Sequence, residues 1–210
     1  MVMTNKVSVI IIEVLIYGAW FWVLRKNIKR GGASAKTENA ILLTALVTTA
    51  VMEILNERIA KYAYYPYPII AMPGFDFPIA ILLGGGLFTW FAYVASGRII
   101  DATMKEKNWT RYAGRLVAFL IMVCAAWPLE PIFLTLGFFK YRQPIGYNLT
   151  HMIGVYVYYL MFTVPAIAVA RLITRAKSPK PSPAAPETKE EKEKRDKTWY
   201  MDKYGGYGGQ

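Results

Sequence analysis

The chain has 210 residues, 55% of them hydrophobic, and a formal net charge of +11. So apolar a composition is unusual for a soluble domain of this length. The positive charge, considered alone, would suggest nucleic-acid binding. The basic residues, however, border the apolar segments, where membrane topology and anionic lipid account for them. The composition therefore predicts a membrane protein whose partner is the lipid bilayer, and it argues against a nucleic-acid partner.

Five apolar segments are close to the length that crosses a bilayer. A helix rises about 1.5 Å per residue, so about 20 residues cover a hydrocarbon core about 30 Å thick. Four basic residues follow the first segment, opposite to the order in a signal peptide, so we expect this segment to be retained. The sequence predicts an all-α fold, a polytopic transmembrane helix bundle, within residues 1–177. The segments are residues 7–24, 40–55, 78–96, 116–139 and 149–170.

Basic residues fall on alternate sides of these predicted spans. Of the 25 Lys and Arg residues, 20 lie in the loops after the first and third segments or in the tail after the fifth. Cytoplasmic loops carry an excess of Lys and Arg. We therefore expect a multi-pass protein of the cell membrane with its amino terminus outside and its carboxyl terminus in the cytoplasm.

Residues 178–210 differ in composition from the rest of the chain. Residues 178–186 are rich in proline, which cannot continue a helix and favours an extended spacer. Residues 187–197 alternate acidic and basic side chains, and the chain ends in a Gly- and Tyr-rich stretch. We expect a disordered or extended cytoplasmic tail. Its one apolar cluster, Trp199 to Met201, could dock on a partner protein or on the membrane interface.

Ionisable residues within or beside the spans gather in one half of the predicted bilayer. Such residues are costly in a membrane and often mark a functional site. With the predicted orientation, each of them lies in the outer half of a span or in an adjoining outer loop. This convergence is the strongest indication of a site in the sequence. The residues are Glu13, Glu53, Glu57, Asp76, Glu130 and His151.

Glu53 and Glu130 are the strongest candidates among these residues. Both lie among apolar neighbours, and Glu130 is framed by Pro128 and Pro131, which break helices and free backbone carbonyls. Glu57 also has a structural explanation as part of an interfacial ion network. The acids and the histidine could hold a divalent metal, but their spacing does not indicate one, and we expect neither metal nor cofactor.

Aromatic residues surround these acids in the sequence. A membrane-interface belt explains the loop tyrosines, but it does not explain Trp90, which lies well inside the third segment. Three glycines, residues 84–86, either let helices approach closely or leave room for a ligand. An apolar cleft with protonatable acids would suit a lipid-soluble polyene. A neutral carboxylic acid can protonate a carbon–carbon double bond, and aromatic faces stabilise the resulting cation.

A set of short motifs between residues 50 and 155 resembles a known family. The motifs are Glu53 before Tyr65-Pro66-Tyr67, Pro78-Ile79 at the start of the span with Trp90, Leu129-Glu130-Pro131, Gly137-Phe138-Phe139-Lys140-Tyr141, and Gly146-Tyr147-Asn148. They resemble the integral-membrane carotenoid biosynthesis family that includes bisanhydrobacterioruberin hydratase, and are distantly similar to small membrane lycopene cyclases. Glu130 stands where that family has aspartate, and Ala126 where the hydratases usually carry a second acid. We therefore expect a divergent member.

The resemblance implies acid-catalysed hydration or cyclisation of a carotenoid or another long-chain isoprenoid. Glu53 and Glu130 would then form the pair of proton donor and acceptor. One alternative is a non-catalytic subunit of a membrane complex that docks through the tail. A proton-coupled transporter is less favoured, because the spans show no internal repeat. The residues expected to line the substrate site are Glu57, Tyr65, Tyr67, Trp90, Asn148 and His151.

Overall fold

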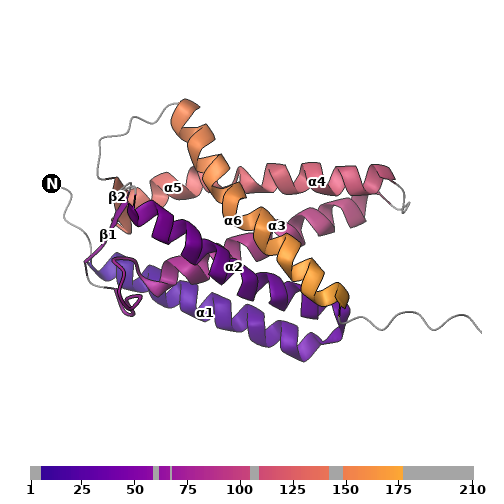
Figure 1. The fold of residues 1–210 in the computed structure, drawn as a ribbon, viewed down its shortest axis with the longest axis horizontal. Helices are drawn as coiled ribbons and strands as arrows, with labels where there is room; N and C mark the ends of the chain where they lie inside the picture. The colour runs from indigo at the N-terminus through magenta and orange to yellow at the C-terminus, as the bar shows by residue number, and fades with distance from the viewer. Residues whose placement is uncertain (1–5, 59–61, 67, 105–108, 142–148, 177–210) are drawn as a thin grey trace, which may run out of the picture. The chain divides into compact units, whose positions relative to one another are not determined.

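The structure is a computed structural model that describes residues 6–58, 62–66, 68–104, 109–141 and 149–176. The predicted tail, residues 178–210, lies outside the described residues. The described part is a helix bundle with one small sheet, so the predicted all-α class is confirmed (Figure 1). Its elements are α1 (Lys6–Arg30), α2 (Gly32–Arg58), β1 (Tyr62–Tyr64), α3 (Ile79–Thr103), α4 (Trp109–Val123), α5 (Ala126–Thr135), β2 (Phe139–Tyr141) and α6 (Leu149–Ala176).

Five helical stretches in the described part are long and apolar enough to cross a membrane, as the sequence predicts. Many large apolar side chains on them point away from the bundle, among them Phe21, Val47 and Leu172, which are 61%, 65% and 68% exposed. In a bilayer these side chains contact lipid rather than water. The protein is therefore a multi-pass membrane protein. The stretches are Lys6–Arg30, Gly32–Asn56, Ile79–Thr103, Tyr112–Thr135 and Leu149–Thr174.

The turn between α1 and α2 is tighter than the sequence predicts. Gly31 and Gly32 adopt φ angles of 64° and 79°, in the left-handed region that favours glycine. The N–H of Gly31 donates to the carbonyl of Asn27 at 3.0 Å and closes the end of α1. Lys29 and Arg30, which suggested a loop, form the last turn of α1. Cations are favourable there because the carboxyl end of a helix carries partial negative charge.

The fourth span is interrupted between α4 and α5, one turn before the position that the sequence suggests. The Pro128 ring clashes with the carbonyl of the residue four positions earlier, which is Cys124. The N–H groups of Cys124 and Ala125 instead bond to carbonyls three residues back, at 3.0 and 3.1 Å. Glu130 itself lies within the regular helix α5. The helix break therefore lies just before α5, the helix that carries Glu130.

The helices α2 and α3 form the centre of the bundle, because α2 contacts α1, α3 and α6 while α3 contacts α1, α2, α4 and α6. They approach closely at the glycine run. A Cβ atom at Gly86 would lie 3.1 Å from the carbonyl oxygen of Leu42, and one at Gly85 would overlap the side chain of Thr49. The glycines therefore permit close contact between α2 and α3, one of the two roles that the sequence suggests.

A two-stranded antiparallel sheet joins the loop after α2 to the turn after α5. Tyr62 pairs with Tyr141, and Tyr64 pairs with Phe139. The sheet lies at one end of the bundle, where α2 ends and α5 ends (Figure 1). It is not evident in the sequence, because a strand of three residues is too short to show a period of two. We call this end of the bundle the sheet end.

Candidate functional site

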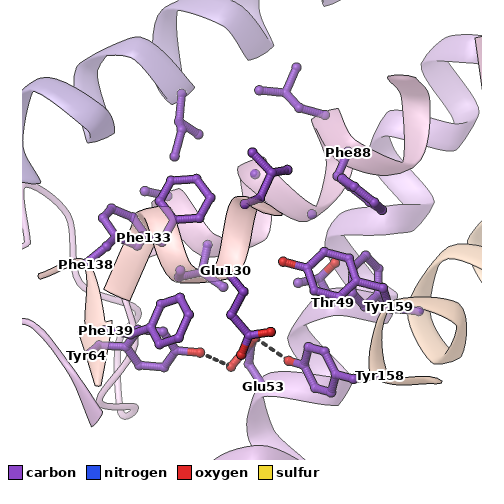
Figure 2. A pocket seen from close by; sticks show the side chains of 18 of the residues that line it. Thr49, Glu53, Tyr64, Phe88, Glu130, Phe133, Phe138, Phe139, Tyr158 and Tyr159 are labelled. Carbon is purple, nitrogen blue, oxygen red and sulfur yellow. Dashed lines mark hydrogen bonds between the residues drawn. The ribbon is translucent and has the colours of Figure 1, made fainter. Parts of the chain in front are cut away.

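A cavity of about 350 Å³ lies between the helices near the sheet end, and we call it the aromatic cavity. Five helices and both strands contribute to its wall: α1, α2, α3, α5 and α6 with β1 and β2. Polar groups on the wall come from Thr49, Glu53, Tyr64, Glu130 and Tyr158 (Figure 2). The aromatic side chains on its wall also include Phe88, Phe91, Phe133, Phe138, Phe139, Tyr159 and Phe162.

Glu53 projects from α2 into this cavity and is 4% exposed. Its Oε1 accepts a hydrogen bond of 2.5 Å from the Tyr158 hydroxyl. Its Oε2 accepts hydrogen bonds from the Tyr64 hydroxyl and, at 3.2 Å, from Nδ2 of Asn56. Tyr64 and Tyr158 reach the carboxyl group from different elements, β1 and α6 (Figure 2). Both carboxyl oxygens are therefore held in fixed positions by donors.

Glu130 enters the same cavity from α5 and is 2% exposed. Its Oε1 lies 3.8 Å from Nε2 of His151, and that nitrogen lies 3.0 Å from the Tyr141 hydroxyl. His151 is itself buried, at 8% exposed. The small sheet thus supplies one tyrosine to each group, Tyr64 to Glu53 and Tyr141 to His151. The structure brings together three of the acid and histidine residues that the sequence predicts to converge: Glu53, Glu130 and His151.

Glu13 belongs to a neighbouring buried group at the same end of the bundle. Its side chain is fully buried, and its Oε2 accepts a hydrogen bond of 2.6 Å from the N–H of Ile69. This bond fastens the loop between β1 and α3 to α1. Burial and the neighbouring Glu13 carboxyl raise the pKa of Tyr65 above that of an ordinary tyrosine. Tyr65 packs against Phe138, with ring centroids 5.0 Å apart, and lies outside the aromatic cavity.

Trp90 lies apart from the aromatic cavity, although the sequence suggests that it lines the substrate site. Its indole N–H donates to Oε2 of Glu38 at 3.0 Å. Glu38 also forms an ion pair of 2.7 Å with Arg30. This group joins α3 to the turn between α1 and α2. Glu38 is not among the predicted site residues because it lies just before the second apolar segment. An acidic residue at a span boundary is a weak signal without a known partner.

The structure does not describe the side chains of three other predicted site residues. Tyr67 and Asn148 lie outside the described residues. Glu57 lies in the last turn of α2, and its side chain is outside the described part of the structure. These assignments stay predictions.

Tyr64, Tyr158 and Tyr141 are site residues that the sequence analysis missed. For Tyr158 a signal exists, because it follows His151 by seven residues, and that spacing places both on one face of a helix. Tyr141 ends one of the motifs quoted above, and Tyr64 had no signal in the sequence. Only the pairing of the two short strands places these tyrosines beside the acids. Within the described ranges, no three His, Cys, Asp or Glu side chains come together as a metal site.

Comparison of the chain with protein-family models, with curated proteins and with solved structures found no match. The geometry of the site therefore has to support any functional assignment.

Proposed function

We propose that this membrane protein binds a long-chain isoprenoid of the carotenoid class in the aromatic cavity and modifies it by acid-catalysed hydration or cyclisation. The observation that carries the proposal is the pair of buried carboxyl groups, Glu53 and Glu130, on the wall of one aromatic, apolar cavity. Buried carboxyl groups are costly in a membrane and are seldom kept without a role. The motifs around the same two residues, which resemble the carotenoid hydratase family, agree with this proposal.

The size and lining of the cavity suit one end of such a chain. Small-molecule sites measure about 300 Å³ or more and are mostly apolar with a few placed polar groups. A cavity of about 350 Å³ is at the small end of this range. The reacting end of the isoprenoid would occupy it, and the rest of the chain would extend between the helices toward the lipid.

The hydrogen bonds favour a division of roles between the two acids. A carboxylate only accepts hydrogen bonds, and three donors point at Glu53, so Glu53 suits the proton acceptor. Glu130 would then be the proton donor. In hydration, Glu130 donates its proton to one alkene carbon and the oxygen of a water molecule bonds to the adjacent cationic carbon. Glu53 takes a proton from that water, so alkene and water give an alcohol.

Aromatic side chains fit the cationic intermediate of such a reaction. The faces of Phe88, Phe133 and Phe139 carry partial negative charge and stabilise a nearby cation. In cyclisation, a second double bond of the substrate would replace water as the group that captures the cation. Loss of a neighbouring C–H proton would then restore the alkene. The same donor and acceptor serve both reactions.

We infer that the sheet end of the bundle faces outside. The tight turn between α1 and α2, at the opposite end, carries Lys29, Arg30 and Lys36, in keeping with the cytoplasmic excess of basic residues. A reporter enzyme fused after Gln210 tests this orientation. It should be active only in the cytoplasm, and activity outside would reverse the assignment.

The functional proposal is tested by expressing the chain in a host that makes acyclic carotenoids and analysing the pigments by mass. A product heavier by one water indicates hydration, and an isomer of unchanged mass indicates cyclisation. Glu130→Gln keeps the shape of the side chain and removes its ionisable proton, so product should fall by about 10²-fold or more. Glu38→Gln is the matched control, because Glu38 is also buried but lies outside the cavity. Unchanged pigments with the wild-type chain, at verified protein levels, would refute the proposal.

A further inference from the structure

A second cavity lies beneath the loop between β1 and α3, and we call it the loop chamber. Its volume is about 430 Å³. Its wall combines the end of α2, the strand β1 and the loop that leads to α3. Asp76 contributes a carboxyl group to it, and Asn56 an amide. The predicted acid Asp76 therefore belongs to this chamber rather than to the aromatic cavity.

The loop chamber and the aromatic cavity share a wall at Glu53. Tyr64 lines both cavities, and its hydroxyl donates to Glu53. Asn56 lines the loop chamber, and its Nδ2 donates to the same carboxyl oxygen at 3.2 Å. Glu53 itself lines the aromatic cavity. Two polar side chains thus connect the loop chamber to a carboxyl group on the wall of the aromatic cavity.

Asn56 offers a hydrogen-bond acceptor that the described residues leave without a partner. A carboxylate accepts and does not donate, so the amide must turn its NH₂ group toward Glu53. The amide oxygen then faces away from Glu53. This oxygen is buried, and it has no hydrogen-bond partner within the described part of the chain. Buried polar atoms of this kind are the usual partners of internal water.

Backbone hydrogen bonds hold the loop that covers the chamber. The N–H of Met72 donates to the carbonyl of Phe77 at 3.0 Å, and that of Ile79 donates to Ile70 at the same distance. The hydrogen bond from Ile69 to Glu13 fastens the loop to α1. Hydrogen bonds therefore hold the wall of the loop chamber in place at the sheet end.

We propose that the loop chamber is the port through which water from the sheet-end side of the membrane reaches Glu53. Asn56 and Tyr64 are positioning residues that pass water toward the carboxyl group. This inference rests on the proposed function for the use of that water. One water molecule adds its oxygen to the substrate cation and gives a proton to Glu53, and return of that proton from Glu53 to Glu130 restores both groups for the next turnover.

Thiol labelling tests the port without reference to any isoprenoid. Cys124 is the single cysteine of the chain, so Cys124→Ala gives a background without thiols. Asn56→Cys places a thiol at the inner end of the port, and Ala80→Cys places one in the aromatic cavity. A charged, membrane-impermeant methanethiosulfonate added to intact cells should modify Asn56→Cys and leave Ala80→Cys unmodified. Ala71→Cys, at an exposed position on the loop, reports that the loop faces the reagent.

Two patterns of labelling in cells without added carotenoid overturn the proposed port. The first is Ala71→Cys modified from outside while Asn56→Cys is not, and the second is Asn56→Cys modified only from the cytoplasmic side. Ala63→Cys, also on the chamber wall, is the second reporter if Asn56→Cys does not accumulate. Protection of the chamber thiol by added carotenoid would also overturn the proposal, because the chamber would then hold substrate.

Filling the chamber provides the functional arm of the test. Ala71→Trp should slow modification of Asn56→Cys and reduce hydrated product, while the carotenoid still copurifies. If Asn56→Cys is modified from outside but the protein has no effect on carotenoids, the proposed water port stands and the proposed function is refuted. If Ala71→Trp abolishes modification of Asn56→Cys but the hydrated product stays normal, the water port is refuted and the proposed function stands.

Discussion

Tyr158 on α6 donates a hydrogen bond of 2.5 Å to Oε1 of Glu53 on α2, across 105 residues of sequence. The same two helices are joined closer to their other ends by hydroxyl groups. Thr44 and Thr48 donate to the carbonyls of Ala166 and Phe162, each at 2.9 Å. The bond to Glu53 is thus one of a row of polar contacts that hold α2 against α6. The candidate site and the packing of these helices share this contact.

Tyr158→Phe should therefore lower stability as well as disturb the site. Removal of a donor to a buried carboxyl group costs about 1–3 kcal/mol. Reversible unfolding in mixed detergent micelles measures the change. Tyr112→Phe is the matched control, because Tyr112 is 70% exposed and should tolerate the change. Equal stability of the two variants would contradict the role assigned to the contact.

The fold could be predicted from the sequence because lipid imposes simple rules. Apolar length identifies the spans, and the positions of basic residues suggest their orientation. The residues at which the helices begin and end were harder to predict from the sequence. Residues 25–39 look like a loop because they are polar, yet most of them extend α1 and α2. The break near Cys124 depends on Pro128, four residues away, and its position follows from the geometry of the ring rather than from composition.

The candidate site was only partly predictable. The convergence of Glu53, Glu130 and His151 follows from counting turns along spans that alternate in direction. The partners of these residues depend on tertiary structure, because Tyr64 reaches Glu53 only through the pairing of two short strands. Trp90, by contrast, does not line the aromatic cavity. An aromatic residue inside a span suggested a ligand, and its actual partner is Glu38, an acid outside the predicted spans.

Gly85→Ala should destabilise the bundle. A Cβ atom there would overlap Oγ1 of Thr49 and lie 2.8 Å from its Cγ2, so either the Thr49 side chain or the two helices would have to shift. Such overpacking costs about 1–3 kcal/mol. Gly18→Ala is the control, because apart from the neighbouring backbone of its own helix nothing lies within 4 Å of the new Cβ, and alanine favours helix by about 1 kcal/mol. Thr49→Ala in the same chain should recover part of the loss, and its failure to do so would place the strain elsewhere.

Trp90→Phe should lower stability without changing the pigment profile. The substitution removes the indole donor to the buried Glu38 carboxyl, at a cost of about 1–3 kcal/mol. Trp22→Phe controls for the loss of an indole, since Trp22 is 60% exposed. Unfolding and pigment analysis should be measured on the same preparations. An altered product at a normal protein level would indicate that Trp90 contacts the substrate.

Tyr65 should make the stability of the protein fall at high pH. An ordinary tyrosine has a pKa of 10.0, and burial and the Glu13 carboxyl raise the pKa of Tyr65 above this value. Above pH 10 the unfolded chain has released this proton while the folded protein keeps it, so stability decreases as pH rises. The slope from this one group is about 1.4 kcal/mol per pH unit.

Tyr65→Phe removes this proton difference and leaves the other tyrosines in place. The stability of the wild-type chain relative to Tyr65→Phe should therefore be constant below pH 10 and fall above it. Chemical unfolding at a series of pH values measures the difference, and Tyr112→Phe serves as the control at an exposed tyrosine. Glu13→Gln should leave the slope just above pH 10 unchanged and end the fall at a lower pH, because it removes only part of the rise in the pKa of folded Tyr65 and burial, the largest cause, remains. A difference between wild type and Tyr65→Phe that stays constant across pH 10 would mean that Tyr65 ionises as readily in the folded protein as in the unfolded chain.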